Sequence, residues 1–532
     1  MLSYRKLAMR VLGHPLHTGG IDSPRPASQR AAAFILTAAM LTTLAAPAFA
    51  DIWHIENGDI TISAGESGNN VTQNNNTTYG DTNTIITNQN KDKASSHTVT
   101  IETNDKNDKV EVTLKDVNID TSSRNKAAVS VTGSGNTTIK LDGDNALKSG
   151  IYGSGSGSLT ISGGENDSLT AQGGSGANGI SSSGSLTISG GTVTANGDDG
   201  GRGISSSGSV TISGGSTVTA NGGSGTISGG DGIWSGGGVT ISGGSTVTAN
   251  GGNGGSLVGG DGIRSGGGLT VSDGTVTAKG GNGDSKDGYG GDGIRSGGVV
   301  TISGNTVNAA GGYGGKVGGY GICSFDRVAI SGGTVEAAGG NGSTGGGSGI
   351  YSSVIDLSGS LELTAKAGSP NGKALSQNGS ELVLDTIKDK LGPGAKVTAT
   401  DADGKVIDQV STPRPVEPEE SSSSSDDGSA TPSAPASPLP GLTVTDKDGQ
   451  RISYTSTQSG NTLTVCVGRF TASFRISLAA LRQLRAEGIE TIAFQTILCS
   501  TTLSVDELLA MGGEDAEAVL THRFTDSSLT VG

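Results

Sequence analysis

The chain is poor in the residues that usually form a globular core. Aromatic residues make up 3% of its 532 residues and hydrophobic residues 32%, which is too little apolar bulk for a conventional core of this length. Its 3 cysteines exclude a scaffold held together by disulfides. Glycine is abundant, with 94 residues, but it does not recur at every third position, so the chain is not collagen-like.

Basic residues are also scarce. The chain carries 35 Lys and Arg residues against 50 Asp and Glu residues, for a formal net charge of −15. Nucleic acids and anionic membranes are bound through basic surfaces, because both carry dense negative charge. The composition therefore argues against nucleic acid or an anionic membrane as a partner.

The first 50 residues have the features of a secretory signal peptide. Basic residues precede an apolar run over 31–46, and Ala48-Phe49-Ala50 then forms a small-residue cleavage pattern that places the cut between Ala50 and Asp51. The apolar run is shorter than the ~20 residues that a membrane-spanning helix needs. No transmembrane segment is expected after removal of the signal peptide. We therefore expect a secreted, extracellular protein or one held non-covalently at the cell surface.

One phrase recurs between residues 150 and 368. Each copy has aliphatic residues at three positions, and successive copies lie 24 to 31 residues apart. Three positions that stay in phase through eight copies indicate a repeat architecture. The first position, after a glycine, is occupied by Ile151, Ile180, Ile204, Ile233, Ile263, Ile294, Ile322 and Ile350. The second is occupied by Ile161, Ile188, Ile212, Ile241, Val271, Ile302, Ile330 and Leu357, and the third by Leu169, Val193, Val218, Val247, Val276, Val307, Val335 and Leu363.

The residues around these positions alternate between apolar and polar, as in Leu186-Thr187-Ile188, which is the pattern of short β-strands. Gly-Gly pairs between them supply sharp corners. Three strands and three corners per copy of about 28 residues predict one coil of a parallel β-helix. We expect right-handed winding, because parallel crossover connections are right-handed in about 98% of cases. The predicted fold is all-β, with eight regular coils.

The flanking segments complete this part of the chain. Residues 51–149 alternate less regularly and are expected to form irregular N-terminal coils that cap the β-helix. Residues 369–410 are expected to form one or two closing coils. Residues 411–440 are rich in Ser, Pro and acidic residues, which is the composition of a solvated linker.

Residues 441–532 differ in character from the repeat. Strand patterns alternate with two helix starts, one capped by Ser477 and one by the capping box of Ser504 and Glu507, and together they predict a small α+β domain. Cys466 and Cys499 both lie in this domain. Export permits a disulfide between them, but the sequence does not determine the distance between the two cysteines, so either state is compatible with it.

Three features resemble a known family. They are the segment Trp53-His54-Ile55-Glu56-Asn57-Gly58-Asp59-Ile60, the turn Asp142-Gly143-Asp144-Asn145 and the run of Leu-Thr-Ile-Ser-Gly-Gly coils. Together they are similar to the secreted carbohydrate-binding-domain-containing proteins of bacteria, which carry right-handed parallel β-helix repeats. The resemblance covers roughly residues 51–400. It implies an exported surface protein that binds a glycan or cell-surface polysaccharide, and it assigns no catalytic residue to this chain.

The residue after each first aliphatic position is expected to point outward, one step along the strand from an inward isoleucine. Tyr and Trp rings stack on sugar rings, and Arg side chains donate hydrogen bonds to hydroxyl or acidic groups. The alternative is that these side chains only cover the glycine-rich corners. The candidate carbohydrate-binding residues in this row are Tyr152, Trp234, Arg264, Arg295 and Tyr351.

Three aspartates, Asp231, Asp261 and Asp292, precede the Gly-Ile pair in consecutive copies and are called the aspartate row below. Carboxylates about 4.8 Å apart repel one another, which raises their pKa values or recruits a cation such as Ca²⁺. The alternative is a series of Asp-Gly turns in water, without any cofactor.

Two other functions are compatible with the pattern. A polysaccharide lyase or hydrolase needs converging acids, and the only repeated acid–base neighbours are Asp261 with Arg264 and Asp292 with Arg295. An ice-binding solenoid would use the Thr-x-Thr pairs of four consecutive copies, although outward threonine is also favoured on any solvated strand. We expect a non-enzymatic, adhesin-like carbohydrate-binding stalk, with these two functions as alternatives.

Overall fold

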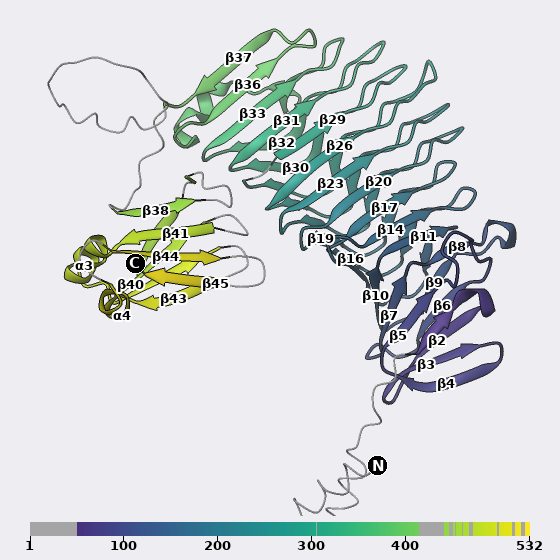
Figure 1. Ribbon diagram of the computed structural model, residues 1–532. Coiled ribbons are helices and arrows are strands. Elements are labelled where there is room, and N and C mark those ends of the chain that lie inside the picture. The colour runs from purple at the N-terminus through teal and green to yellow at the C-terminus, as the bar shows by residue number, and fades with distance from the viewer. Residues whose placement is uncertain are drawn as a thin grey trace, which may run out of the picture. The chain divides into compact units, whose positions relative to one another are not determined.

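Figure 1 shows a computed structural model of the chain, which divides into two compact units, Met1–Glu419 and Glu420–Gly532. The predicted signal peptide, residues 414–440 of the predicted linker, and Cys499 lie outside the described residues. The structure describes residues 51–304, 306–413, 441–445, 451–452, 454–459, 461–467, 472–496, 500–512, 516–522 and 527–531.

The first unit is a β-solenoid of about 13 turns with coils of about 28 residues. Each regular coil contributes three short strands, as predicted, and each strand pairs in parallel with its counterpart one coil on. The first rank comprises β12 (Ile151–Gly153), β15 (Ile180–Ser182), β18 (Ile204–Ser206), β21 (Ile233–Ser235), β24 (Ile263–Ser265), β27 (Ile294–Ser296) and the beginnings of β30 (Ile322–Ile330) and β32 (Ile350–Leu357).

The other two ranks follow the second and third aliphatic positions. The second rank comprises β13 (Leu159–Ser162), β16 (Leu186–Ser189), β19 (Val210–Ser213), β22 (Val239–Ile241), β25 (Leu269–Val271), β28 (Val300–Ile302) and the ends of β30 and β32. The third rank comprises β14 (Ser168–Gln172), β17 (Thr192–Asn196), β20 (Thr217–Asn221), β23 (Ser245–Asn250), β26 (Gly274–Lys279), β29 (Thr306–Ala310), β31 (Gly333–Ala338) and β33 (Leu361–Lys366).

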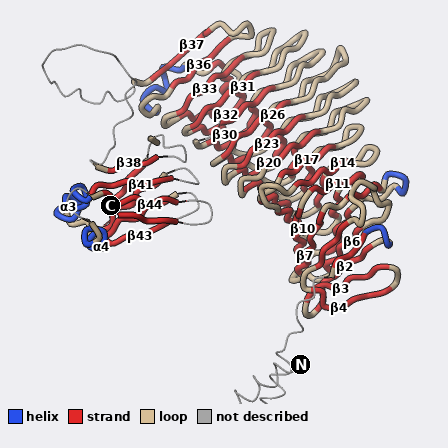
Figure 2. The backbone as a smooth tube through the Cα atoms, in the orientation of Figure 1, coloured by secondary structure: helices blue, strands red, loops and turns tan. Residues whose placement is uncertain are grey.

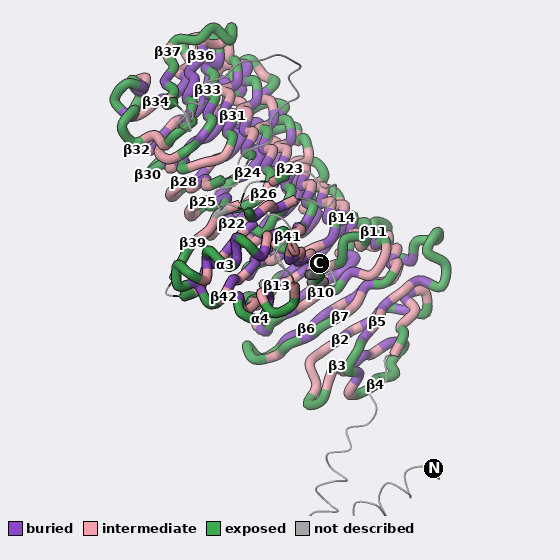
Figure 3. The backbone as a smooth tube through the Cα atoms, turned by 60° about the vertical axis from the view of Figure 1, so that its left-hand side comes forward, coloured by how far each residue is buried: buried purple, intermediate pink, exposed green. Residues whose placement is uncertain are grey.

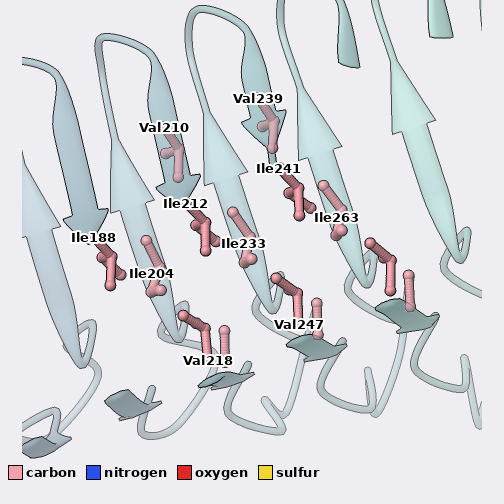
Figure 4. Packing of buried hydrophobic residues seen from close by; sticks show 14 of the residues in the cluster. Ile188, Ile204, Val210, Ile212, Val218, Ile233, Val239, Ile241, Val247 and Ile263 are labelled. Carbon is pink, nitrogen blue, oxygen red and sulfur yellow. The ribbon is translucent and has the colours of Figure 1, made fainter. Parts of the chain in front are cut away.

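The three predicted aliphatic positions form the core. Ile233, Ile241 and Val247 of one coil are fully buried, and each lies in register with the same position on the coils before and after it. Figure 4 shows these side chains stacked into columns between the three ranks. Most of the intervening residues are partly or fully exposed, as the alternation along the strands in Figure 3 shows. A narrow core of this kind explains the low hydrophobic content, because each coil buries only a few side chains.

Glycine-rich loops connect each third-rank strand to the next first-rank strand, and they are the tan loops that extend beyond the strands in Figure 2. We call this stacked layer of loops, residues 222–232, 251–262, 280–293, 311–321 and 339–349, the glycine flange. Its backbone hydrogen bonds run both between and within loops: the Gly252 N–H donates to Gly230 O of the preceding loop at 2.8 Å, and the Gly260 N–H donates to Gly252 O of its own loop at 2.8 Å. A Cβ atom at Gly260 would lie 1.9 Å from Gly230 O, so only glycine fits.

The ends of the solenoid differ from its middle. The N-terminal coils contain β1 (Ile52–His54), β2 (Ile60–Gly65), β3 (Gly68–Gln73), β4 (Asn76–Asp81), β5 (Thr84–Thr87), β6 (Val99–Thr103), β7 (Lys109–Lys115), β8 (Asn118–Asp120), the 3-10 turns η1 (Ile55–Asn57) and η2 (Ser122–Arg124), β9 (Val129–Gly133), β10 (Asn136–Asp142) and β11 (Asp144–Lys148). The C-terminal end contains β34 (Leu375–Gln377), β35 (Ser380–Glu381), η3 (Leu384–Lys390), β36 (Lys396–Thr400) and β37 (Val406–Ser411). Antiparallel pairs, β2–β3–β4 at one end and β36–β37 at the other, replace parallel stacking and so block continued coil addition.

The second unit has two four-stranded sheets and two short helices. Phe474 and Phe494, one from each sheet, pack with ring centroids 4.9 Å apart. The predicted caps are confirmed: the Ser477 and Ser504 hydroxyls accept hydrogen bonds from the Ala480 and Glu507 amides. The elements are β38 (Leu442–Thr445), β39 (Thr455–Ser459), β40 (Thr462–Cys466), β41 (Ala472–Ser477), α3 (Leu478–Ala486), β42 (Thr491–Gln495), β43 (Ser500–Ser504), α4 (Val505–Ala510), β44 (Glu517–His522) and β45 (Ser527–Val531).

Candidate functional site

The residues after the first aliphatic positions lie in one continuous row along the solenoid, which we call the outer ladder. The ladder extends further toward the N-terminus than the repeat pattern predicts, through β9, β6 and β2. Its members are Cα partners in this order: Thr61, Thr100, Ser130, Tyr152, Ser181, Ser205, Trp234, Arg264, Arg295, Cys323, Tyr351 and Ser376.

Most outer-ladder side chains reach the surface, and Tyr152 is the most exposed aromatic among them at 54%. Ser205, Cys323 and Ser376 are buried instead, because each is a small side chain with a larger one, Trp234 or Tyr351, on the adjacent coil. Burial raises the pKa of the Cys323 thiol to about 12, so this cysteine is not a nucleophile at neutral pH.

Three of the ladder side chains already have partners within the protein. The Arg202 guanidinium lies over the Trp234 ring, 4.3 Å from its centroid, and so covers one face of the indole. Tyr351 stacks on Tyr320 with ring centroids 4.9 Å apart, and Arg295 lies 5.3 Å from the Phe325 ring. Tyr152 has no such cover among the described residues, so its ring is the ladder aromatic most available to a ligand.

The aspartate row is buried beside the outer ladder rather than open to solvent. Asp231, Asp261 and Asp292 are 6%, 6% and 3% exposed. The Asp261 amide donates to the Asp231 carboxylate at 2.9 Å and the Asp292 amide to the Asp261 carboxylate at 2.7 Å, so each side chain bridges to the next coil. The alternative interpretation of the row, a series of Asp-Gly turns in water, is therefore wrong, because stacking of the coils removes these carboxylates from solvent.

Arginines balance the charge of the aspartate row. Arg202 donates to Asp231 at 3.2 Å, Arg295 donates to Asp292 at 3.2 Å, and Arg264 lies 3.9 Å from Asp261. Sequence reasoning missed Arg202, although it stands two residues before Ile204 just as Asp231 stands two residues before Ile233. Counting that offset in every copy would have found it.

Burial also controls the protonation of the row. Desolvation raises the pKa of Asp292 to about 6, and desolvation with repulsion from both neighbouring carboxylates raises the pKa of Asp261 well above its usual value. Among the described residues no three His, Cys, Asp or Glu side chains converge as a group that could hold a metal ion. The carboxylates face amides and arginines, and this arrangement also offers no pair of open acids for hydrolysis.

A groove of about 800 Å³ lies beside the ladder, where the N-terminal coils meet the first regular coils. Tyr152, Ser130, Thr100 and Ser181 of the outer ladder form part of its wall. The remaining lining residues are mostly hydroxyl, amide and small side chains: Thr98, Ser122, Asn125, Lys126, Ala127, Ser149, Ile151, Gly174, Ser175, Ala177 and Asn178. Hydroxyl and amide groups around one exposed aromatic ring provide hydrogen bonds and a stacking surface for a polar ring-shaped ligand.

A second hollow, of about 570 Å³, lies at the next rung of the ladder, where Thr61 belongs to its wall. Its charged centre is Asp59, which accepts two hydrogen bonds from Arg124, at 2.6 and 2.7 Å, and one from the Thr98 amide at 2.9 Å. The His97 Nδ1 atom lies 3.1 Å from the same carboxylate. These bonds hold the pKa of Asp59 well below its usual range, so this carboxylate stays ionised and paired.

The Thr-x-Thr pairs occupy the third rank, on a different strand from the ladder. Thr217 and Thr219 are in register with Thr246 and Thr248, and the array extends over β17, β20, β23 and β26. Asn308 of β29 then takes the place of the second threonine.

Comparisons with protein-family models, with curated protein sequences and with solved structures find no match for this chain. The fold established here is therefore the β-solenoid itself, and the resemblance to bacterial carbohydrate-binding-domain-containing proteins remains an interpretation of the sequence. Among the described residues, neither helix is long and apolar enough to cross a membrane.

Proposed function

We propose that this protein is a non-enzymatic, carbohydrate-binding β-solenoid, and that the groove around Tyr152 is its binding site. The observation that carries the proposal is the exposed Tyr152 ring within a groove lined by hydroxyl and amide side chains. Carbohydrate offers matching chemistry, because sugar rings have an apolar face that stacks on aromatic rings and hydroxyls that exchange hydrogen bonds with Ser, Thr and Asn.

The outer ladder beyond the groove extends the proposed site. Trp234 and Arg264 lie on adjacent coils and are partly and fully exposed, so they are placed to contact a ligand that leaves the groove along the ladder. We expect their contribution to be smaller than that of Tyr152, because Arg202 already covers one face of the Trp234 ring.

The sequence supports the proposed location. A signal-like segment with a cleavage pattern between Ala50 and Asp51 favours export, and a rigid stack of coils suits an adhesin-like stalk at or outside the cell surface. The lyase, hydrolase and ice-binding alternatives receive less support, since the acidic row is buried and the threonine array is interrupted at Asn308.

Binding of the mature chain, residues 51–532, to a glycan array followed by titration calorimetry on the glycan bound tests this proposal. Tyr152→Ala should weaken binding by about 1 kcal/mol, the contribution of one ring contact, without changing the unfolding temperature. Tyr79→Ala is the matched control, because Tyr79 is 76% exposed on β4 and does not line the groove. Equal affinity of the Tyr152→Ala variant and the native chain would remove the groove from consideration.

A further inference from the structure

We infer that the ligand of the groove is a linear acidic polysaccharide that lies parallel to the solenoid axis. This inference rests on the proposed function and specifies the ligand class. It follows from two features of the described residues: the rungs of the outer ladder that line both hollows, and the distribution of charge around them.

The two hollows are consecutive along the ladder. Thr61 lines the second hollow, and its register partner Thr100 lines the groove, followed by Ser130, Tyr152 and Ser181. Five rungs at about 4.8 Å per coil extend over about 19 Å. A compact monosaccharide fills only a fraction of that length, whereas an extended glycan repeats its hydroxyl groups along its axis much as the ladder repeats one side chain per coil. Because both the glycan and the outer ladder repeat their hydrogen-bonding groups along one direction, a linear glycan is favoured that lies parallel to the solenoid axis.

The charge of the groove is opposite to that of the whole protein. None of the described residues that line the groove carries a carboxylate, and Lys126 is its charged side chain. Lys126 is exposed and forms no ion pair with a described residue. In a chain of net charge −15, an acid-free groove with an unneutralised ammonium group is a site complementary to an anion.

Two carboxylates that contact groove residues or their chain neighbours, Asp59 and Asp120, are already neutralised. Asp59 is held by Arg124, and Asp120 accepts hydrogen bonds from the Ser122 hydroxyl and from Lys148 at 3.1 Å. They therefore repel an anionic ligand less than free carboxylates would. An ammonium group acts as a point charge for a carboxylate or sulfate, and the surrounding hydroxyls donate the additional hydrogen bonds that either group accepts.

The test compares two linear acidic polysaccharides, alginate and hyaluronan, each in native form and after chemical reduction of its carboxyl groups to alcohols. The reduced polymers keep the sugar chain but lose the charge. The mature chain should bind a native polymer and lose most of that affinity toward its reduced form, and added salt should weaken binding. Lys126→Gln should reduce affinity about fivefold, the upper end for one exposed ion pair. Lys366→Gln, at an exposed lysine on β33 outside the groove, should have no effect.

Oligomers of increasing length test the direction of the chain. Affinity should rise with length until the oligomer covers the five rungs, about 19 Å, and then level off. Equal binding of native and reduced polymers, or an array hit confined to neutral glycans, would overturn the acidic ligand while leaving carbohydrate binding intact. Affinity that is already maximal for a single sugar unit would overturn the axial chain. Binding to no glycan in either form would overturn the proposed function itself.

Discussion

Asp261 illustrates what stacking does to a single charged residue. Its carboxylate accepts a hydrogen bond from the Asp292 amide and lies beside two other carboxylates, and its countercharges are Arg264 at 3.9 Å and the more distant charge of Arg295. Its pKa is therefore raised in the folded state relative to the unfolded chain, so the folded state binds the proton first as the pH falls. The ionised Asp261 carboxylate therefore lowers the free energy of unfolding at neutral pH, and its protonation at lower pH removes this loss.

The substitution Asp261→Asn should therefore stabilise the solenoid at neutral pH. The amide oxygen still accepts the Asp292 N–H, but the buried charge is gone. When the pH is lowered from about 7 to about 5, the same variant should gain less stability than the native chain. The reason is that it lacks the Asp261 carboxyl, whose protonation contributes to the gain in the native chain. Thermal unfolding followed at both pH values measures the two effects. A variant that is less stable at neutral pH and has an unchanged pH dependence would contradict this account.

At the scale of the strands and loops, the fold was predictable where the copies are in phase. Ile233, Ile241 and Val247 could be assigned to the core from spacing alone, because each coil repeats the same inward position and stacks on its neighbour. The fold class, the short strands and the helix caps at Ser477 and Ser504 followed from the same local patterns.

The groove could not be predicted in this way. Its wall joins Tyr152 of the first regular coil to Thr98, Ser122 and Lys126, which belong to N-terminal coils of irregular length, so counting residues does not place them together. The short turn η2 brings Lys126 next to the ladder, and nothing in the local sequence marks that turn as part of a site. Sequence reasoning therefore identified Tyr152 but not its surroundings.

The glycine flange predicts an unequal tolerance of alanine. Gly260→Ala should be severely destabilising, because its Cβ would lie 1.9 Å from the Gly230 carbonyl oxygen and backbone would have to move in two coils. Gly345→Ala is the control: it lies in the same layer, but its Cβ would be 3.8 Å from the Val317 side chain, an ordinary contact. Chemical denaturation should give a large loss for the first variant and little change for the second. Equal stability of the two would show that the flange is not packed as described.

At the scale of the whole molecule, the two units have separate hydrophobic cores, and we expect their stabilities to respond to acid in opposite directions. Burial raises the pKa of Asp261, Asp292 and Glu381 in the solenoid, so lowering the pH from about 7 to about 5 should stabilise it. Burial lowers the pKa of His522 in the second unit. The unfolded chain then binds the proton first, and this unit should lose stability as the pH falls through about 6.5.

Differential scanning calorimetry of the mature chain should therefore resolve two transitions whose midpoints shift in opposite directions on acidification. The truncated protein of residues 51–413 should retain only the transition that rises. His522→Gln should flatten the pH response of the other transition in the full mature chain. A single transition, or two that shift together, would mean that the units are energetically coupled.

The regular register of the coils has a consequence for how such a protein changes over generations. Each middle coil presents the same aliphatic columns and glycine layer to the coil on either side, so two coils that are not neighbours have matching surfaces. Loss of residues 234–263 would join Ile233 directly to Arg264 and restore an Ile-Arg-Ser strand, and the reverse event would insert a coil. Recombination between near-identical repeats can thus alter the reach of the molecule in increments of about 4.8 Å without disturbing its caps or its groove.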